Sequence, residues 1–118
     1  MDTRDLSVAR VKIIALSRIH QIVDDVRRNP LGYRKDTREY CDAMYDIIDQ
    51  MAPERLTSLV EKLYASYAEM GMAEDGYIAD SLMTLALAMY QNEIGERNVY
   101  DMGWDRMVEE FFHTTAAV

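Results

Sequence analysis

Apolar side chains recur at intervals of three and four residues through most of this chain, and this spacing constrains its fold more than any other feature. Residues spaced in this way lie along one face of an α-helix. Between residues 5 and 28 the repeating positions are Val8, Val11, Ala15, Leu16, Ile19, Ile22, Val23 and Val26. Two prolines and five glycines in 118 residues are few for a protein built from strands and turns. The sequence therefore predicts an all-α fold.

Turn and cap residues divide this pattern into five expected helices. The turn at residues 29–32, Asn-Pro-Leu-Gly, ends the first, because proline disfavours the helical conformation for the residue before it. Asp36, with Glu39 three residues later, has the spacing of a capping box at the start of the second. Pro53 suits the first turn of the third helix, and Gly71 suits its end. The expected helices are residues 5–28, 36–52, 53–70, 77–96 and 100–112.

The fourth expected helix, residues 77–96, is apolar on two sides. One side holds Ile78, Leu82, Leu85 and Met89, and the other holds Met83, Leu87, Tyr90 and Ile94. A helix of this kind is buried between neighbours. A chain of 118 residues can bury one core. We therefore expect a single helical domain, residues 1–118, folded as a compact bundle of about five helices with a buried central fourth helix.

The cysteine count and the N-terminal segment indicate a reducing compartment. Cys41 is the one cysteine, so it has no internal disulfide partner. The first residues carry acids at Asp2 and Asp5, and no small-residue cleavage site follows the first apolar stretch. The longest nearly apolar stretch, residues 82–90, is far shorter than the ~20 residues that cross a bilayer. We expect a cytoplasmic protein with no membrane partner.

Charge is distributed unevenly along the chain, whose net charge is -8. Residues 1–35 hold eight bases and four acids, net +4, whereas residues 36–118 hold five bases and seventeen acids, net -12. An acidic surface of this size repels nucleic acid and attracts basic surfaces on other proteins. We therefore expect no direct binding of nucleic acid. The alternative interpretation is that the charge serves solubility alone.

Four acids within the second expected helix share one side of it. Glu39, Asp42, Asp46 and Asp49 fall within an arc of about 80° at 100° per residue. Stacked carboxylates on a helix lie about 5–6 Å apart, close to the spacing of phosphates along one strand of nucleic acid. Their repulsion costs a few tenths of a kcal/mol per pair. The row is either a phosphate mimic that binds a partner or a solvated acidic face.

Ile13 and Ile14 lie outside the main apolar stripe of the first expected helix. Either this helix is covered on two sides within one subunit, or the two residues form an apolar patch near Arg10 and Arg18. Such a patch would suit a homodimer or a hydrophobic partner.

Residues for catalysis or metal binding are scarce. Glu110 and His113 have the Glu-x-x-His spacing of di-iron helical bundles, but Ser17 occupies the matching position before His20, so a second pair is missing. Cys41 has no flanking histidine, and no phosphate loop, dinucleotide fingerprint or calcium loop occurs. We expect no catalytic residues, no metal and no cofactor, and hence not an enzyme.

One resemblance to a known family rests on the later part of the chain. The order of Cys41–Met44, Ile47, Met51–Pro53, Tyr67–Met72, an acidic loop and Ala88–Gln91 resembles that of Ocr-type antirestriction proteins of phages. The resemblance implies a small acidic helical dimer that imitates the charge pattern of bent DNA and occupies the DNA-binding groove of a restriction enzyme. Here the first helix is basic and no long acidic run ends the chain, which leaves room for a related role such as inhibition of a CRISPR effector.

Together these patterns give a leading function and two rivals. The leading hypothesis is a non-enzymatic acidic helical inhibitor from a phage or mobile element, acting in the host cytoplasm. Its acidic face, led by Glu39, Asp42, Asp46 and Asp49, would bind the nucleic-acid site of a basic host defence protein. The first rival is a helical adaptor or chaperone that binds a partner helix or peptide through Ile13, Ile14 and nearby methionines. The second is a DNA-binding regulator that uses the basic first helix, which the net charge of -12 elsewhere opposes.

Overall fold

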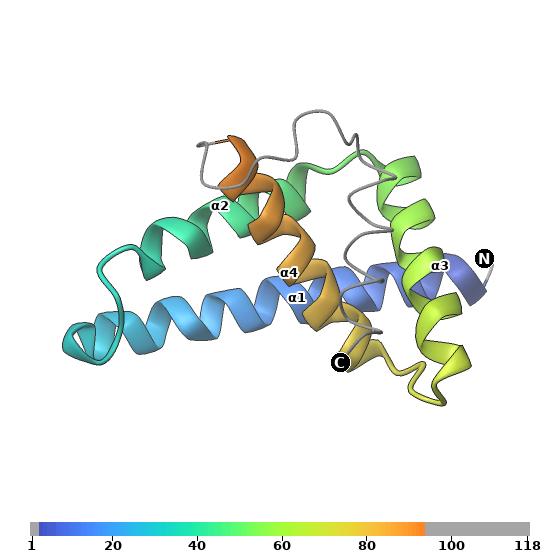
Figure 1. Cartoon of the computed structure of the whole chain (residues 1–118), viewed down its shortest axis with the longest axis horizontal. Coiled ribbons are helices and arrows are strands. Elements are labelled where there is room, and N and C mark those ends of the chain that lie inside the picture. Colours follow the sequence, from blue (N-terminus) through green and yellow to red (C-terminus); the bar gives the residue numbers. More distant parts are fainter. Residues whose placement is uncertain (1–2, 94–118) are drawn as a thin grey trace.

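The computed structural model of the chain describes residues 3–93, and within this range it is all helical, with no strand (Figure 1). Its elements are α1 (Thr3–Arg28), the short 3-10 helix η1 (Pro30–Gly32), α2 (Thr37–Gln50), α3 (Pro53–Glu69) and α4 (Asp75–Glu93). The all-α prediction is confirmed. Four α-helices are seen where about five were expected, because the expected helix at 100–112 lies outside the described residues.

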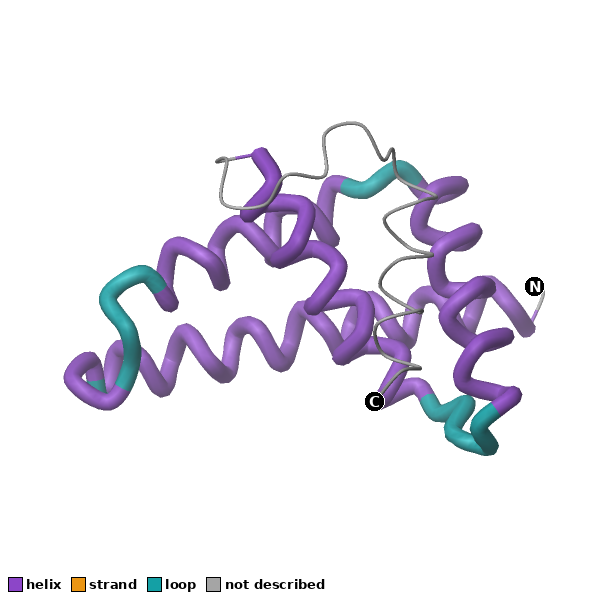
Figure 2. Tube along the Cα trace, viewed as in Figure 1, coloured by secondary structure: helices purple, strands orange, loops and turns teal. Residues whose placement is uncertain are grey.

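The connections between helices are short (Figure 2). Only Met51 and Ala52 separate α2 from α3, and both have extended backbone, with ψ of 134° and 137°. The extended backbone of Ala52 is what the residue before a proline favours. α2 ends at Gln50, two residues earlier than the sequence predicts. The polypeptide turns sharply here, and Pro53 occupies the first turn of α3 as expected.

The start of α2 differs from the predicted capping box. Asp36 occupies the position before the helix, but its side chain makes no capping hydrogen bond. Its backbone, at φ -89° and ψ -2°, is helical rather than in the extended region that an N-cap residue typically adopts. One carboxylate oxygen of Asp36 instead accepts a hydrogen bond from Arg34 at 3.0 Å. The capping-box prediction is therefore wrong.

The end of α3 is the turn that the glycine predicted. Gly71 has a φ of +70°, in the left-handed region. The backbone N–H of Met72 donates to the carbonyl of Tyr67 at 2.9 Å, and that of Gly71 donates to the carbonyl of Ala68 at 3.0 Å. This pair of bonds is the Schellman motif, which satisfies carbonyls that the last helical turn leaves free. The prediction of a glycine stop is confirmed.

Each helix contributes one row of apolar side chains to a common core. α1 lies along α2, and α4 packs against both of them, while α3 packs on α1 and α4 (Figure 1). The buried core residues are Val11, Ala15, Ile19 and Val23 from α1, Cys41, Met44 and Ile48 from α2, Leu56, Leu59, Val60 and Leu63 from α3, and Ile78, Ala79, Leu82, Leu85 and Ala86 from α4. Packing of these rows fixes which side of each helix faces solvent.

α4 contacts all three other α-helices. Its side chains at Ile78, Leu82 and Leu85 are fully buried, whereas Asp80 and Thr84 are exposed. The residues after Glu93 lie outside the described part of the chain, so the buried central position of the fourth helix stays a prediction. Between residues 3 and 93, none of the helices combines the length and the apolar character that crossing a membrane requires.

Basic residues of α1 contact acidic residues far along the chain. Arg10 Nε lies 2.8 Å from a carboxylate oxygen of Asp75, at the start of α4. Arg18 donates to the carbonyl of Gly76 at 2.8 Å and forms an ion pair with Asp80. Because these pairs are partly exposed, each contributes only about 0–1 kcal/mol. They show that two bases of the N-terminal segment are directed at α4 within one molecule.

We predict that Gly71→Ala destabilises the protein by about 1 kcal/mol, because an L-residue with a side chain adopts positive φ at a cost. No atom lies within 4 Å of a Cβ built at this position, so the loss reports backbone conformation without a steric clash. Urea unfolding followed by circular dichroism measures it. Gly71→Asn is the matched control and should lose less, since asparagine tolerates this conformation. Equal losses for the two variants would contradict the explanation.

Candidate functional site

The four acids singled out in the sequence form an exposed row on α2. Glu39, Asp42, Asp46 and Asp49 are all exposed to solvent. The opposite side of α2 carries the buried residues Cys41, Met44 and Ile48. Because the apolar side of α2 packs against the core, the side that carries the carboxylates faces solvent. We call these four residues the acidic row.

Three members of the acidic row have a polar neighbour. The hydroxyl of Tyr90, on α4, donates to Glu39. Arg38 Nε lies 3.4 Å from Asp42 Oδ1, a helical i,i+4 pair. Lys12 Nζ, on α1, donates to the backbone carbonyl of Asp49 at 3.1 Å. Because Arg38 and Asp42 are both exposed, their attraction is weak. The row therefore keeps acidic character.

A cleft of about 350 Å³ runs between α1 and α2 on one side of the row. His20 of α1 and Tyr45 of α2 line it, with ring centroids 6.0 Å apart. Arg27, Asp42 and Asp46 line it as well. Its charged groups thus include both signs. A mixed lining of this kind favours no single ligand charge.

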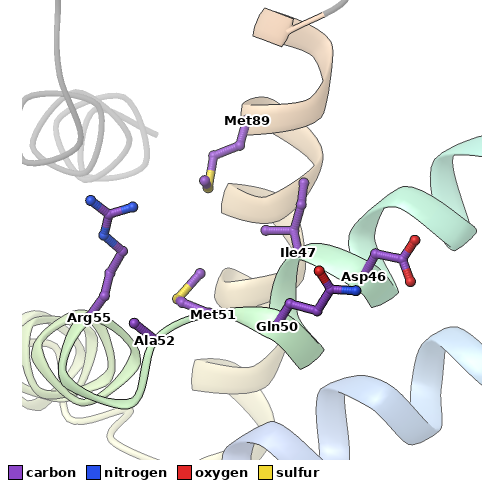
Figure 3. A pocket seen from close by; sticks show the side chains of 7 residues that line it. All are labelled: Asp46, Ile47, Gln50, Met51, Ala52, Arg55 and Met89. Atoms are coloured by element: carbon purple, nitrogen blue, oxygen red, sulfur yellow. The ribbon is translucent and has the colours of Figure 1, made fainter.

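A second cleft, of about 300 Å³, lies where α2, α3 and α4 meet (Figure 3). It is lined by Asp46, Ile47, Gln50, Met51, Ala52, Arg55 and Met89. We call this cleft the methionine groove. Asp46 lines both clefts and stands between them. The acidic row and the methionine groove therefore form one continuous surface.

The cysteine of α2 is not poised for chemistry. Burial, reinforced by the nearby charge of Asp42, raises the pKa of the Cys41 thiol. A thiol with a raised pKa is protonated at neutral pH and is a poor nucleophile.

Within residues 3–93, no group of three or more His, Cys, Asp or Glu side chains is placed to hold a metal ion. Glu110 and His113, the pair with di-iron spacing, lie outside the described residues.

The two isoleucines outside the main stripe of α1 have different surroundings. Ile14 is half-buried and packs against the core, whereas 63% of Ile13 is exposed. Arg10 and Arg18, expected near this patch, are paired with Asp75 and Asp80 of α4. The apolar patch is therefore narrower than the sequence suggested, with Ile13 as its exposed member.

Sequence reasoning missed the methionine groove. In the sequence, Met89 lies on one apolar side of the fourth expected helix, and Arg55 and Gln50 belong to no motif. The groove is built from residues on three helices, and no spacing within one helix could have indicated it. The Arg38–Asp42 pair, in contrast, has the i,i+4 spacing of a helical ion pair and was visible in the sequence.

No family model, curated protein sequence or solved structure matches this chain. The resemblance to Ocr-type antirestriction proteins therefore stays a prediction, and the function is inferred from the residues of the chain itself.

We predict that Asp46→Asn stabilises the protein slightly at low salt. Asp46 lies four residues after Asp42 and three before Asp49, and each like-charged helical pair costs about 0.2–0.5 kcal/mol. Urea unfolding at low and high salt measures the gain, which should vanish at high salt because ions screen exposed charges.

Asp25→Asn is the matched control for this measurement. Asp25 is paired with Arg28 at 3.4 Å, so neutralising it removes an attraction and should give no gain. A loss of stability in Asp46→Asn would mean that the acidic row is not under repulsion.

Proposed function

We propose that this protein is a non-enzymatic acidic binding module whose acidic row docks on the basic nucleic-acid site of another protein and blocks it. The observation that carries the proposal is the exposure of all four carboxylates along one side of a helix. Their apolar counterparts Met44 and Ile48 are buried, so the row is presented by a helix that the core holds in place.

The charge pattern supports a basic partner. Nucleic-acid sites use lysine and arginine to bind phosphates. Carboxylates at helical spacing offer negative charges about 5–6 Å apart, in the range that such a site accepts. The acidic part of the chain, net -12 over residues 36–118, would also speed the encounter with a positively charged surface. The partner is therefore defined by its chemistry, as a protein that binds nucleic acid through exposed basic residues.

The source of the protein and the class of its target are proposed from the resemblance to Ocr-type antirestriction proteins. We propose an inhibitor encoded by a phage or mobile element, acting in the host cytoplasm against a restriction enzyme or a CRISPR effector. The same resemblance suggests a homodimer. No cofactor is proposed, since the module would act by occupying a site.

A second candidate function is a helical adaptor that binds an apolar surface of a partner. The exposure of Ile13 favours it, because 63% of this large apolar side chain faces solvent. Ile14 contributes less, since it packs against the core. The DNA-binding regulator has less support, because Arg10 and Arg18 of the basic helix contact Asp75 and Asp80.

We predict that neutralising the acidic row abolishes partner binding. The variant replaces Glu39, Asp42, Asp46 and Asp49 with the corresponding amides. Tagged wild-type protein incubated with bacterial lysate should retain a nucleic-acid-binding protein at low salt and release it as salt rises, because screening weakens exposed charge pairs. Mass spectrometry identifies the retained protein.

The control variant makes the same change of charge elsewhere, at the exposed residues Asp24, Glu54, Glu69 and Glu74. It should retain most of the binding. If both variants bind the partner equally well, the acidic row is not the docking surface and the proposal is wrong.

The adaptor hypothesis predicts a different response. If Ile13 anchors a partner, the wild-type protein should retain that partner at high salt, since apolar contacts are not screened. The variant Ile13→Asp should lose it. Ser17→Asp, an exposed position one turn later on α1, adds the same charge as a control. A salt-resistant partner lost only in Ile13→Asp would replace the inhibitor proposal with the adaptor.

A further inference from the structure

The methionine groove combines an apolar lining with charge at its edges. Ile47, Met51 and Met89 lie between Asp46 on one side and Arg55 on the other (Figure 3). Ile47 and Met51 also pack against the core, so that part of the lining is fixed. The groove is thus an apolar hollow directly beside the acidic row.

We propose that this groove receives one apolar side chain of the partner, while an arginine or lysine next to that side chain pairs with Asp46. The inference rests on the proposed function, because it names a second part of the same docking surface. Its partner segment is defined chemically, as an aliphatic or aromatic residue adjacent to a basic one. The acidic row attracts the segment, and the groove anchors it.

The charges around the groove select a basic segment. Asp42 and Asp49 lie within one helical turn of Asp46, so three carboxylates stand on the same side. Arg55 lies on the opposite side of the groove (Figure 3). The three carboxylates favour a base on the Asp46 side of the groove, which orients the bound segment.

Methionine suits a groove that must fit an incoming side chain. Its unbranched, polarisable side chain adapts to irregular shapes. Met51 lies in the connection after α2 and Met89 lies in α4, so the two side chains approach the groove from separate elements (Figure 3). An apolar anchor among them would be shielded from water by the polar rim, the arrangement found at the centre of protein interfaces.

The test selects ligands from a random 12-residue peptide library displayed on phage, using the full chain as the immobilised target. Enriched peptides should carry an apolar residue beside arginine or lysine. In spectra of the full chain with ¹³C-labelled methionine methyl groups, such a peptide should shift the signals of Met51 and Met89. Met70 and Met72 follow the C-terminal end of α3 and are exposed. Their signals serve as internal controls for non-specific contact.

Two variants separate the groove from the acidic row, and a third is a control for the added charge. Met89→Lys places a cation in the groove and should weaken the selected peptide by about tenfold or more. Thr84→Lys adds the same charge at an exposed position of α4 and should leave affinity within about twofold. Asp46→Asn should weaken binding and reduce its dependence on salt. Circular dichroism of each variant checks that the fold is retained.

Each outcome bears on one proposal or both. Peptides that lack the apolar and basic pair, that shift Met70 and Met72 instead, or that fail to be enriched would overturn the groove inference. Equal affinity for Met89→Lys and wild type, with binding lost on neutralising the acidic row, would overturn the groove and leave the proposed function standing. Binding that needs Met89 and ignores the acidic row would overturn the proposed function and the pairing with Asp46, and would leave only the apolar anchor in the groove.

Discussion

Packing of Cys41, Met44 and Ile48 against the core sets the rotation of α2, and the candidate surface depends on that rotation. These three residues are buried, so the helix can turn only its other side to solvent. The four acids lie on that side because they fall between the apolar positions at helical spacing. Desolvating any one of these carboxylates would cost far more than the mutual repulsion of the row. The exposure of the acidic row therefore depends both on the packing of the core and on the positions of the acids in the sequence.

The same core brings opposite charges together across the molecule. α1 packs against α4, and this contact places Arg10 beside Asp75 and Arg18 beside Asp80. Some of the basic charge of the N-terminal segment is offset there. The acidic row on α2 is offset less, since Arg38 is the one ion-pair partner seen for it among the described residues. Negative charge thus remains concentrated on α2, where the proposed partner would approach.

The acidic row and the methionine groove would contribute differently to binding. Exposed carboxylates act at a distance, which raises the rate of encounter and makes it sensitive to salt. An apolar hollow acts only on contact, and it slows dissociation. Because Asp46 belongs to both features, a segment with adjacent basic and apolar residues could use them together. Charge would therefore act mainly on association, and the shape of the groove mainly on dissociation.

The sequence by itself determined the all-α class, the glycine stop at Gly71 and the shared side of the four acids, because periodicity and turn chemistry act over a few residues. The sequence-based prediction of an N-cap at Asp36 was wrong, because capping depends on the backbone conformation of Asp36, which the flanking turn sets. Only the tertiary structure decided that Ile14 packs inward while Ile13 stays exposed, and that α2, α3 and α4 meet around a groove. Arg10 and Asp75 are 65 residues apart, and their pairing likewise follows from helix packing. Local spacing carries no information about which helices become neighbours, since that depends on how all the apolar faces fit together at once.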